Sequence, residues 1–245
     1  MTDAPAGPPP RPDAVCDGGD LDCGSGLLLI IRRAMDPLRP GGVLEVRSRE
    51  GSVREDLPAW CRMTGNDLLA SSPGEGRSTS YFVRKGGDDA ALRADLEKAR
   101  GFAWTVRVRW TEGMRATAYA RNHSIPLGQP ASLDTADPAP SAVETLLASL
   151  GGCLAVGFQW RLSARGVAVR NLEVSLRARS ANLLVFLGAE DAGDPGLEKI
   201  EGSVFVDAEA GEPLLREVWE ETLRRSPIAR TLLRGTPLSL EVKPS

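Results

Sequence analysis

The apolar and polar positions in the first part of the chain predict short strands that alternate with helices. Four apolar residues recur at helical spacing before Pro37: Leu27, Leu28, Ile31 and Met35. The stretches "GGVLEVRS" and "STSYFVRK" favour strands. The stretch "EDLPAWCRMTG" predicts a second helix with an acidic start, a proline in its first turn and Gly65 at its end. We therefore expect a small two-layer α+β domain over residues 15–85.

The second part of the chain begins with strict alternation and then changes to helical spacing. In "WTVRVRW" four apolar side chains would share one face of a strand: Trp104, Val106, Val108 and Trp110. The stretch "RATAYARNHSIPL" continues this strand as a hairpin after a turn at Glu112 and Gly113. A long helix follows over about residues 141–165, in which Ser141 and Glu144 fit a capping box. Its predicted apolar face consists of Val143, Leu146, Leu147, Leu150, Leu154, Phe158 and Leu162.

The elements after this helix complete the predicted organisation. Strands are expected at 167–179, 197–209 and 238–243, with a helical region between the last two that Pro227 interrupts. We therefore predict a second α+β domain over residues 104–245, with a long central helix against antiparallel sheets. The polar stretch 86–103 predicts a helical linker, and the proline-rich residues 1–14 predict a disordered tail.

Composition and charge narrow the classes of function. The 245 residues carry a net charge of −3 with both signs mixed, which argues against a nucleic-acid-binding face. We find neither a run of about twenty apolar residues nor an apolar signal segment, so we expect a cytoplasmic protein without membrane contact. The four cysteines are irregularly spaced and are expected to be reduced. With one histidine and no CxxC pair, we expect no metal site and no cofactor.

Cys153 lies in the middle of the long predicted helix, in "SLGGCLAVGFQW". A thiol there gains little from the helix dipole, and free cysteines are often buried, so a core thiol is one interpretation. Gly151 and Gly152 cost about 1 kcal/mol each in a helix, which indicates close packing of a partner backbone or a second helix against the thiol. A reactive Cys153 would need a nearby cation and a proton acceptor.

The stretch "DPAPSAVETLLASLGGCLA" resembles the signature of the OsmC/Ohr family, which comprises osmotically inducible and organic-hydroperoxide-resistance proteins. The likeness extends over about 140 residues, from "WTVRVRW" to "LSLEVK". The resemblance implies a homodimer through this domain, with each site at the subunit interface. It also implies that Cys153 is the peroxidatic thiol, assisted by an Arg and a Glu, and that its attack on a peroxide oxygen gives a sulfenic acid.

Further residues take roles from this resemblance, each with a simpler alternative. Glu144 lies in the region of the family's Glu, although it also serves the predicted helix cap. Arg115 lies near the position of the activating Arg, although an exposed strand arginine explains it equally well. His123 resembles a family "GH" segment or is a turn residue. Ser226 replaces the family's second cysteine, so an external thiol must complete the reaction or the protein is not a peroxidase.

Cys23 is the second candidate nucleophile. In "DLDCGSGLL" it precedes the first predicted helix, whose free N–H groups and dipole would favour a thiolate. The neighbouring carboxylates of Asp20 and Asp22 oppose this by repulsion. A capping or partly buried cysteine is the alternative.

Residues 15–85 resemble the TusA/SirA family of small sulfur-carrier proteins, which have a β-α-β-α-β-β plan. The matching pieces are "DLDC", "PLRPGGVLEVRS", "DLPAWCRMTGNDLL" and "YFVRK". The resemblance implies that Cys23 carries a persulfide in a CPxP motif, in which Gly24 and Gly26 replace the two prolines. Cys61 is expected in the core, and Cys16, near the tail, is a candidate resolving thiol.

Three hypotheses follow for the function. The first is a thiol-dependent peroxidase that reduces hydroperoxides at Cys153 with an external thiol as reductant. The second is a sulfurtransferase in which Cys23 carries a persulfide and exchanges sulfur with Cys153. The third is a binding module for small molecules without turnover. Linking two thiols in one chain raises their effective concentration to about the millimolar range, which supports the second hypothesis. Peroxide reduction is the commonest chemistry of the OsmC/Ohr family, so the resemblance makes the first hypothesis the leading one.

Overall fold

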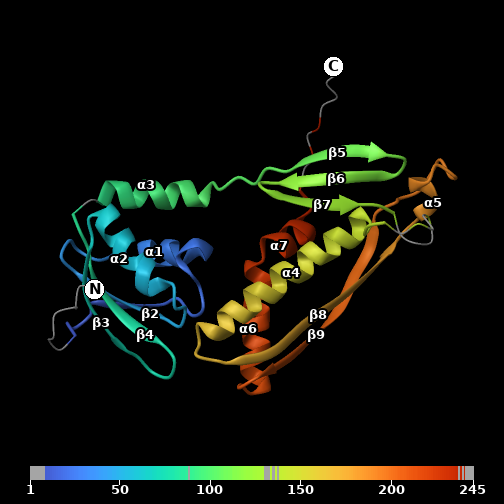
Figure 1. Ribbon diagram of the computed structural model, residues 1–245. Coiled ribbons are helices and arrows are strands. Elements are labelled where there is room, and N and C mark those ends of the chain that lie inside the picture. Colours follow the sequence, from blue (N-terminus) through green and yellow to red (C-terminus); the bar gives the residue numbers. More distant parts are fainter. Residues whose placement is uncertain are drawn as a thin grey trace. The chain divides into compact units, whose positions relative to one another are not determined.

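The computed structural model describes residues 9–87, 89–129, 133, 136, 138–236, 238 and 240. The chain divides into two compact units. The first unit comprises Met1–Ala103 with Ser163–Val167, and the second comprises Trp104–Leu162 with Ala168–Ser245. Each unit has its own sheet structure and its own apolar core (Figure 1).

The first unit contains a four-stranded sheet with the order β1-β2-β4-β3. Its strands are β1 (Ala14–Asp17), β2 (Val43–Ser48), β3 (Asp67–Pro73) and β4 (Thr79–Arg84). β1 runs parallel to β2, and the other neighbours are antiparallel. The helices α1 (Leu28–Met35) and α2 (Val53–Thr64) lie together on one side of this sheet (Figure 1). The predicted β-α-β-α-β-β plan is confirmed.

The core of the first unit forms between these helices and the sheet. Leu27, Ile31 and Met35 are each at most 1% exposed, which confirms the apolar stripe predicted for the first helix. Full burial of such side chains contributes about 1.5–3 kcal/mol each. α2 ends at Gly65, whose φ of 68° is left-handed, as the sequence predicts.

Two helix starts in the first unit differ from the prediction. α2 begins at Val53, so Pro58 lies inside the helix and not in its first turn. Pro58 lacks an N–H and therefore removes one internal hydrogen bond. α1 begins only at Leu28, because Gly26, with a φ of 112°, kinks the chain before it. In the region predicted as a linker, α3 (Asp89–Arg100) contacts α1.

The second unit contains two antiparallel sheets. The three-stranded sheet consists of β5 (Arg107–Glu112), β6 (Arg115–Ala120) and β7 (His123–Leu127). The two-stranded sheet consists of β8 (Val169–Ser180) and β9 (Leu197–Ala208), which the short helix α5 (Leu183–Phe186) separates in the chain. The predicted hairpin after Gly113 is confirmed. However, β5 begins at Arg107, so Trp104 and Val106 precede the strand.

The longer helices of the second unit are α4 (Ala142–Ser163), α6 (Glu212–Arg225) and α7 (Pro227–Arg234). α4 runs along the β8–β9 hairpin (Figure 1). Four residues of its predicted apolar face are buried: Leu150, Leu154, Phe158 and Leu162. Val143 and Leu146, at its N-terminal end, are 47% and 37% exposed. The predicted face is therefore covered only over its C-terminal part.

α4 is long and apolar enough to cross a membrane when only its length and composition are considered. The core helix of a soluble protein meets the same criterion, so this observation is weak evidence for a membrane segment. Only 22% of the apolar stretch of α4 is buried within the chain.

The strand predicted at 238–243 lies mostly outside the described residues, and neither Leu238 nor Leu240 belongs to a strand.

Candidate functional site

The Cys153 thiol faces the Ser226 hydroxyl across the helix packing of the second unit. Cys153 Sγ lies 3.1 Å from Ser226 Oγ. The cysteine is half-buried on α4, whereas Ser226 is only 4% exposed. The sequence identified Ser226 as the residue in place of a second cysteine but did not predict this contact. The contact joins residues 73 positions apart, so only the tertiary structure reveals it.

Ser226 is held at the junction of α6 and α7. Its backbone N–H donates to the Thr222 carbonyl oxygen at 2.9 Å, which closes the end of α6. Its Oγ accepts from the Ala229 N–H at 3.1 Å, which caps the start of α7. Pro227 follows directly and favours the extended conformation that Ser226 adopts, with φ −73° and ψ 119°. The position of the hydroxyl is thus fixed from both sides.

A cavity of about 820 Å³ lies in the second unit, and neither Cys153 nor Ser226 is among the residues that line it. Its wall includes Leu150 and Leu154, which flank Cys153 on α4, and Ala229, whose N–H bonds to Ser226. Leu176 of β8 and Trp219 of α6 form other parts of the wall. The size suits a small organic ligand, and the lining combines apolar side chains with charged ones such as Lys199, Glu201 and Arg216.

The close packing of α4 is at Gly157 and not at the glycine pair that the sequence singled out. A Cβ on Gly152 would meet nothing within 4 Å, and one on Gly151 would make ordinary contacts. A Cβ on Gly157 would come within 3.4 Å of Thr222 and 3.0 Å of the Arg161 guanidinium. Within the described part of one chain, no second helix packs closely on Gly152, and packing of a partner backbone there stays a prediction.

The Arg161 side chain lies in the same α4–α6 contact. Its guanidinium donates to the Gly157 carbonyl oxygen at 2.7 Å and lies 3.8 Å from a Glu221 carboxylate oxygen. Sequence reasoning missed this residue, although its spacing of two helical turns from Cys153 would have placed both near one face of α4.

Glu144 forms the predicted capping box. Its carboxylate accepts from the Ser141 N–H at 2.7 Å, and Ser141 Oγ accepts from the Glu144 N–H at 3.2 Å. The hydrogen bonds from the Ser141 side chain and backbone lower the pKa of Glu144. Nine residues of helix separate it from Cys153, or about 13 Å along the axis. Within one copy of the chain, this carboxylate is therefore out of hydrogen-bond reach of the thiol.

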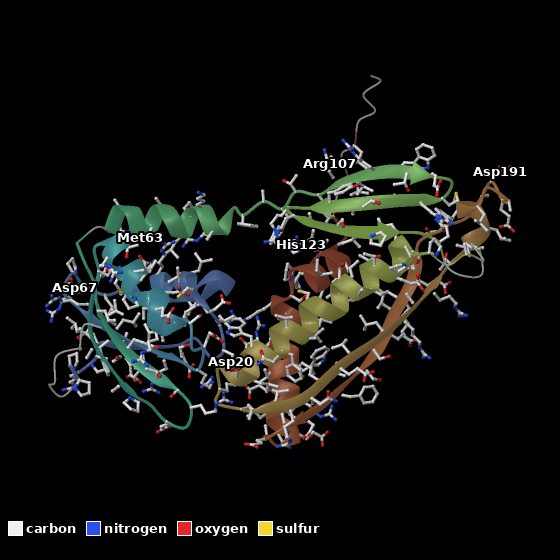
Figure 2. All side chains as sticks on the ribbon, in the orientation of Figure 1. Asp20, Met63, Asp67, Arg107, His123 and Asp191 are labelled. Carbon is white, nitrogen blue, oxygen red and sulfur yellow. The ribbon has the colours of Figure 1, made fainter. Side chains whose placement is uncertain are left out.

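Arg115 and His123 lie on the three-stranded sheet. Arg115, at the start of β6, places its guanidinium 3.3 Å from the Glu112 carboxylate across the β5–β6 turn. His123 begins β7 opposite Ala120 and is exposed (Figure 2). Arg115 is half-buried and His123 belongs to a strand, so neither fits its simpler alternative fully, and the roles of both residues stay predictions.

Cys23 lies in the first unit at the start of η1 (Cys23–Leu27), a single wide helical turn that precedes α1. The Leu27 N–H donates to the Asp22 carbonyl oxygen at 3.3 Å, and Gly26 makes the kink. Proline fixes φ near −65°, so a proline cannot occupy position 26 in this conformation. The turn is therefore built differently from one that a CPxP motif would form.

The surroundings of Cys23 favour its neutral thiol. Burial, then the carboxylates of Asp56 and Asp22, raise the pKa of Cys23 to about 11. The predicted stabilisation of a thiolate by the start of the helix is outweighed, because α1 begins five residues after Cys23. Cys23 packs partly against the core that contains Cys61, whose pKa burial raises to about 12.

Cys61 and Cys16 are core thiols. Cys61, on α2, is 1% exposed, as expected from the sequence. Cys16 lies in β1 beside Val46 of β2 and is 5% exposed, so it is part of the sheet and not of a tail. Burial, then Asp17, raise its pKa to about 11. Both environments disfavour a resolving role.

Metal ligands do not gather in the described part of the chain. Among those residues, no group of three or more His, Cys, Asp or Glu side chains is placed to hold a metal ion. In Figure 2 the labelled Met63, 85% exposed on α2, is a large apolar side chain at the surface of the first unit.

Comparison with known proteins relates the first unit to a protein family. A family model described as "Sulfurtransferase TusA" matches residues 26–85. The sulfur carrier protein TusA of Pseudomonas paraeruginosa strain PA7 is 32% identical over 76 residues, which are 31% of this chain and 94% of that protein. The N-terminal part of the chain belongs to the TusA family. The TusA protein of Pseudomonas putida strain GB-1 is also 32% identical, over 77 residues and 94% of its length.

A second family model follows this TusA domain in the chain. The model described as "OsmC-like protein" matches residues 134–241, which include Cys153 and Ser226. An OsmC-like protein from Mycoplasma pneumoniae is similar to 54% of the chain over 89% of its own, with a TM-score of 0.47 and 16% identity. The organic hydroperoxide resistance protein OhrB of Bacillus subtilis gives a TM-score of 0.39 at 12% identity, over 55% of the chain and 92% of its own. The two family models therefore match separate parts of the chain, the TusA model residues 26–85 and the OsmC-like model residues 134–241.

Proposed function

We propose that this protein handles sulfur through two thiols, with Cys23 as a persulfide carrier and Cys153 as the thiol that exchanges sulfur with it. The observation that carries the proposal is the contact between Cys153 Sγ and Ser226 Oγ at 3.1 Å. The position facing the thiol holds a group that cannot form a disulfide. A sulfur atom placed on Cys153 is therefore released by a thiol from outside its own domain.

The exchange is a thiol–persulfide reaction. The Cys153 thiolate attacks the outer sulfur of the Cys23 persulfide, a new S–S bond forms on Cys153, and Cys23 leaves as a thiolate. A small external thiol then attacks the outer sulfur on Cys153 and leaves as its own persulfide, with Cys153 again a thiolate. Each step forms and breaks one S–S bond, so no further oxidant or reductant is required. The reverse direction uses the same steps.

The high pKa of Cys23 fits a carrier that is loaded by a partner. At neutral pH its thiol is almost fully protonated, so it reacts slowly with small molecules in solution. A donor protein with a basic face would offset the carboxylates of Asp56 and Asp22 during docking. Such a donor would load Cys23 faster than a small persulfide in solution does.

Hydroperoxide reduction at Cys153 is the second candidate function, and the cavity of the second unit favours it. The Cys153 thiolate would attack one peroxide oxygen, the O–O bond would break, and the alcohol would leave with a proton. One external thiol would then convert the sulfenic acid to a mixed disulfide and water, and a second would release Cys153. The cavity beside Leu150 and Leu154 would hold the apolar part of the peroxide.

Mass spectrometry of the reduced full-length protein separates the two functions. Glutathione persulfide is expected to add one sulfur atom to Cys23 and then to Cys153. The Cys23→Ser variant should slow the labelling of Cys153, and the Cys153→Ser variant should leave the sulfur on Cys23. Cumene hydroperoxide with glutathione should give little turnover. Rapid peroxide turnover without sulfur transfer would support the second candidate, and modification of neither thiol would contradict both.

A homodimer through the OsmC domain is part of this proposal. Only 22% of the apolar stretch of α4 is buried within one chain, and Val156, on this helix, is 70% exposed. On β5, Val108 and Trp110 share a face and are 55% and 73% exposed. A second copy would cover this apolar surface. Sedimentation equilibrium should give twice the chain mass, and a monomer at micromolar concentration would contradict this assignment.

The reduced cysteines that the exchange requires place the protein in a reducing compartment, which we take to be the cytoplasm. A small thiol such as glutathione would be the external partner there. Fractionation of cells that express the full-length chain tests this assignment, and recovery with exported proteins would contradict it.

A further inference from the structure

We propose that Ser226 is a working part of the thiol site, because its hydroxyl donates a hydrogen bond to the Cys153 sulfur and stabilises its charged form. The inference deepens the proposed function, since both exchange steps use Cys153 as a thiolate. It concerns how the site works without a second cysteine, and it depends only on contacts within the second unit.

The direction of the hydrogen bond follows from the other contact of Ser226. Its oxygen already accepts from the Ala229 N–H at 3.1 Å, so the hydroxyl hydrogen is available to another acceptor. Cys153 Sγ lies within 3.1 Å of the same oxygen. When Cys153 loses its proton, the sulfur can only accept, and the hydroxyl becomes the donor.

The hydroxyl is held in place before the thiol ionises. The Ser226 backbone is bonded to Thr222 at the end of α6, and its side chain caps α7, so little freedom is lost when it donates to sulfur. Ser226 is 4% exposed, and a buried hydrogen bond to a charged group is stronger than one in water. Cys153 also faces the start of α7, whose dipole favours negative charge nearby.

A serine at this position also has a chemical consequence. A cysteine 3.1 Å away would capture a sulfenic acid or persulfide on Cys153 as a disulfide. Serine keeps the hydrogen bond but cannot form that bond, so the modified sulfur stays available to a thiol that enters from outside. The same residue thus promotes the first step and leaves the product open for the second.

The test measures the alkylation of Cys153 in the full-length chain as a function of pH. Iodoacetamide labels the protein, and peptide mass spectrometry reads Cys153 apart from the other three cysteines. Ser226→Gly removes the hydroxyl while glycine remains a fair helix cap. We expect the midpoint pH of alkylation to rise by about one unit. A one-unit rise lowers the thiolate fraction at neutral pH about tenfold. The more basic thiolate is also the better nucleophile, so the rate at neutral pH should fall only about threefold.

Two further variants separate this role from a structural one. Ser226→Thr keeps both the hydroxyl and the cap, and its midpoint should match that of the natural protein. Ser149→Ala is the matched control, because it removes a hydroxyl one turn before Cys153 that bonds to its own helix at the Thr145 carbonyl. Its midpoint should not move.

Two results would overturn the inference. One is an unchanged midpoint in a folded Ser226→Gly protein. The other is an equal shift in the Ser226→Thr or the Ser149→Ala protein. If the glycine variant does not fold, Ser226→Ala removes the same hydroxyl, and an unchanged midpoint in that protein would overturn the inference in the same way. The measurement uses no persulfide and no peroxide, so a failure of the proposed sulfur exchange leaves it interpretable.

Discussion

The two thiols of this protein lie in opposite kinds of environment. Cys23 occupies a kinked turn, where burial and the carboxylates of Asp56 and Asp22 raise its pKa to about 11. Cys153 occupies a regular helix and faces a hydroxyl at 3.1 Å. The place of Cys23 beside a helix start would by itself favour a thiolate there, but burial and the two carboxylates outweigh that effect. The groups that face the sulfur therefore matter more than its place along a helix.

The largest expected effect comes from making the position opposite Cys153 reactive. In Ser226→Cys, the two sulfur atoms would face each other, and a modest approach brings them to the roughly 2.05 Å of a disulfide. We expect peroxide or a persulfide to convert the variant fully to a disulfide between Cys153 and the introduced cysteine, with the loss of two hydrogens in the intact mass. The natural protein should keep a singly modified Cys153.

The matched control for this change is Ser149→Cys, which places a thiol one turn away on the same helix at an exposed position. It should form no disulfide with Cys153, because both side chains belong to one helix. If both thiols of Ser226→Cys stay free after prolonged treatment with peroxide, the two side chains do not face each other in solution.

The next effect is the pH dependence of Cys23. With a pKa of about 11, the thiolate fraction of Cys23 rises roughly a hundredfold between pH 8 and pH 10. An ordinary thiol, with its pKa near 8.5, gains less than about tenfold and levels off. Iodoacetamide labelling read on the Cys23 peptide measures this slope. Asp56→Asn should shift the curve to lower pH, and a natural protein that levels off near pH 9 would contradict the environment described for Cys23.

These differences show what the sequence could predict. Local periodicity determines the order of strands and helices and the apolar stripe of Leu27, Ile31 and Met35. The pattern of apolar and polar residues was therefore enough to predict them. The φ of Gly26 depends on how the turn meets the core, which no spacing encodes. The Cys153–Ser226 contact depends on the packing of α4 against α6 and α7. The resemblance therefore indicated which residue replaces a cysteine, and only the fold showed what that residue contacts.

A smaller effect concerns the turn that holds Cys23. Gly26 has a φ of 112°, whereas Gly24 does not have a positive φ. Gly26→Ala should lower the free energy of unfolding by about 1–2 kcal/mol, because a Cβ disfavours that conformation. Gly24→Ala should change it less, since its Cβ would meet only the flexible Asp22 carboxylate, at 3.3 Å. Urea unfolding compares the two, and equal losses would mean that the kink at position 26 is absent in solution.

The smallest effect is expected at Glu144, and it tests whether this carboxylate belongs to the helix cap or to the thiol site. Because hydrogen bonds from Ser141 lower the pKa of Glu144, its contribution to stability is present above the pKa of the unfolded state and is lost as the pH falls through the lower folded value. Glu144→Gln should therefore reduce the loss of stability on acidification. The rate of Cys153 alkylation should stay unchanged, since about 13 Å of helix separates the two residues. A slower rate in Glu144→Gln, with Ser141→Ala unaffected, would instead show that the carboxylate reaches Cys153 from a second copy of the chain.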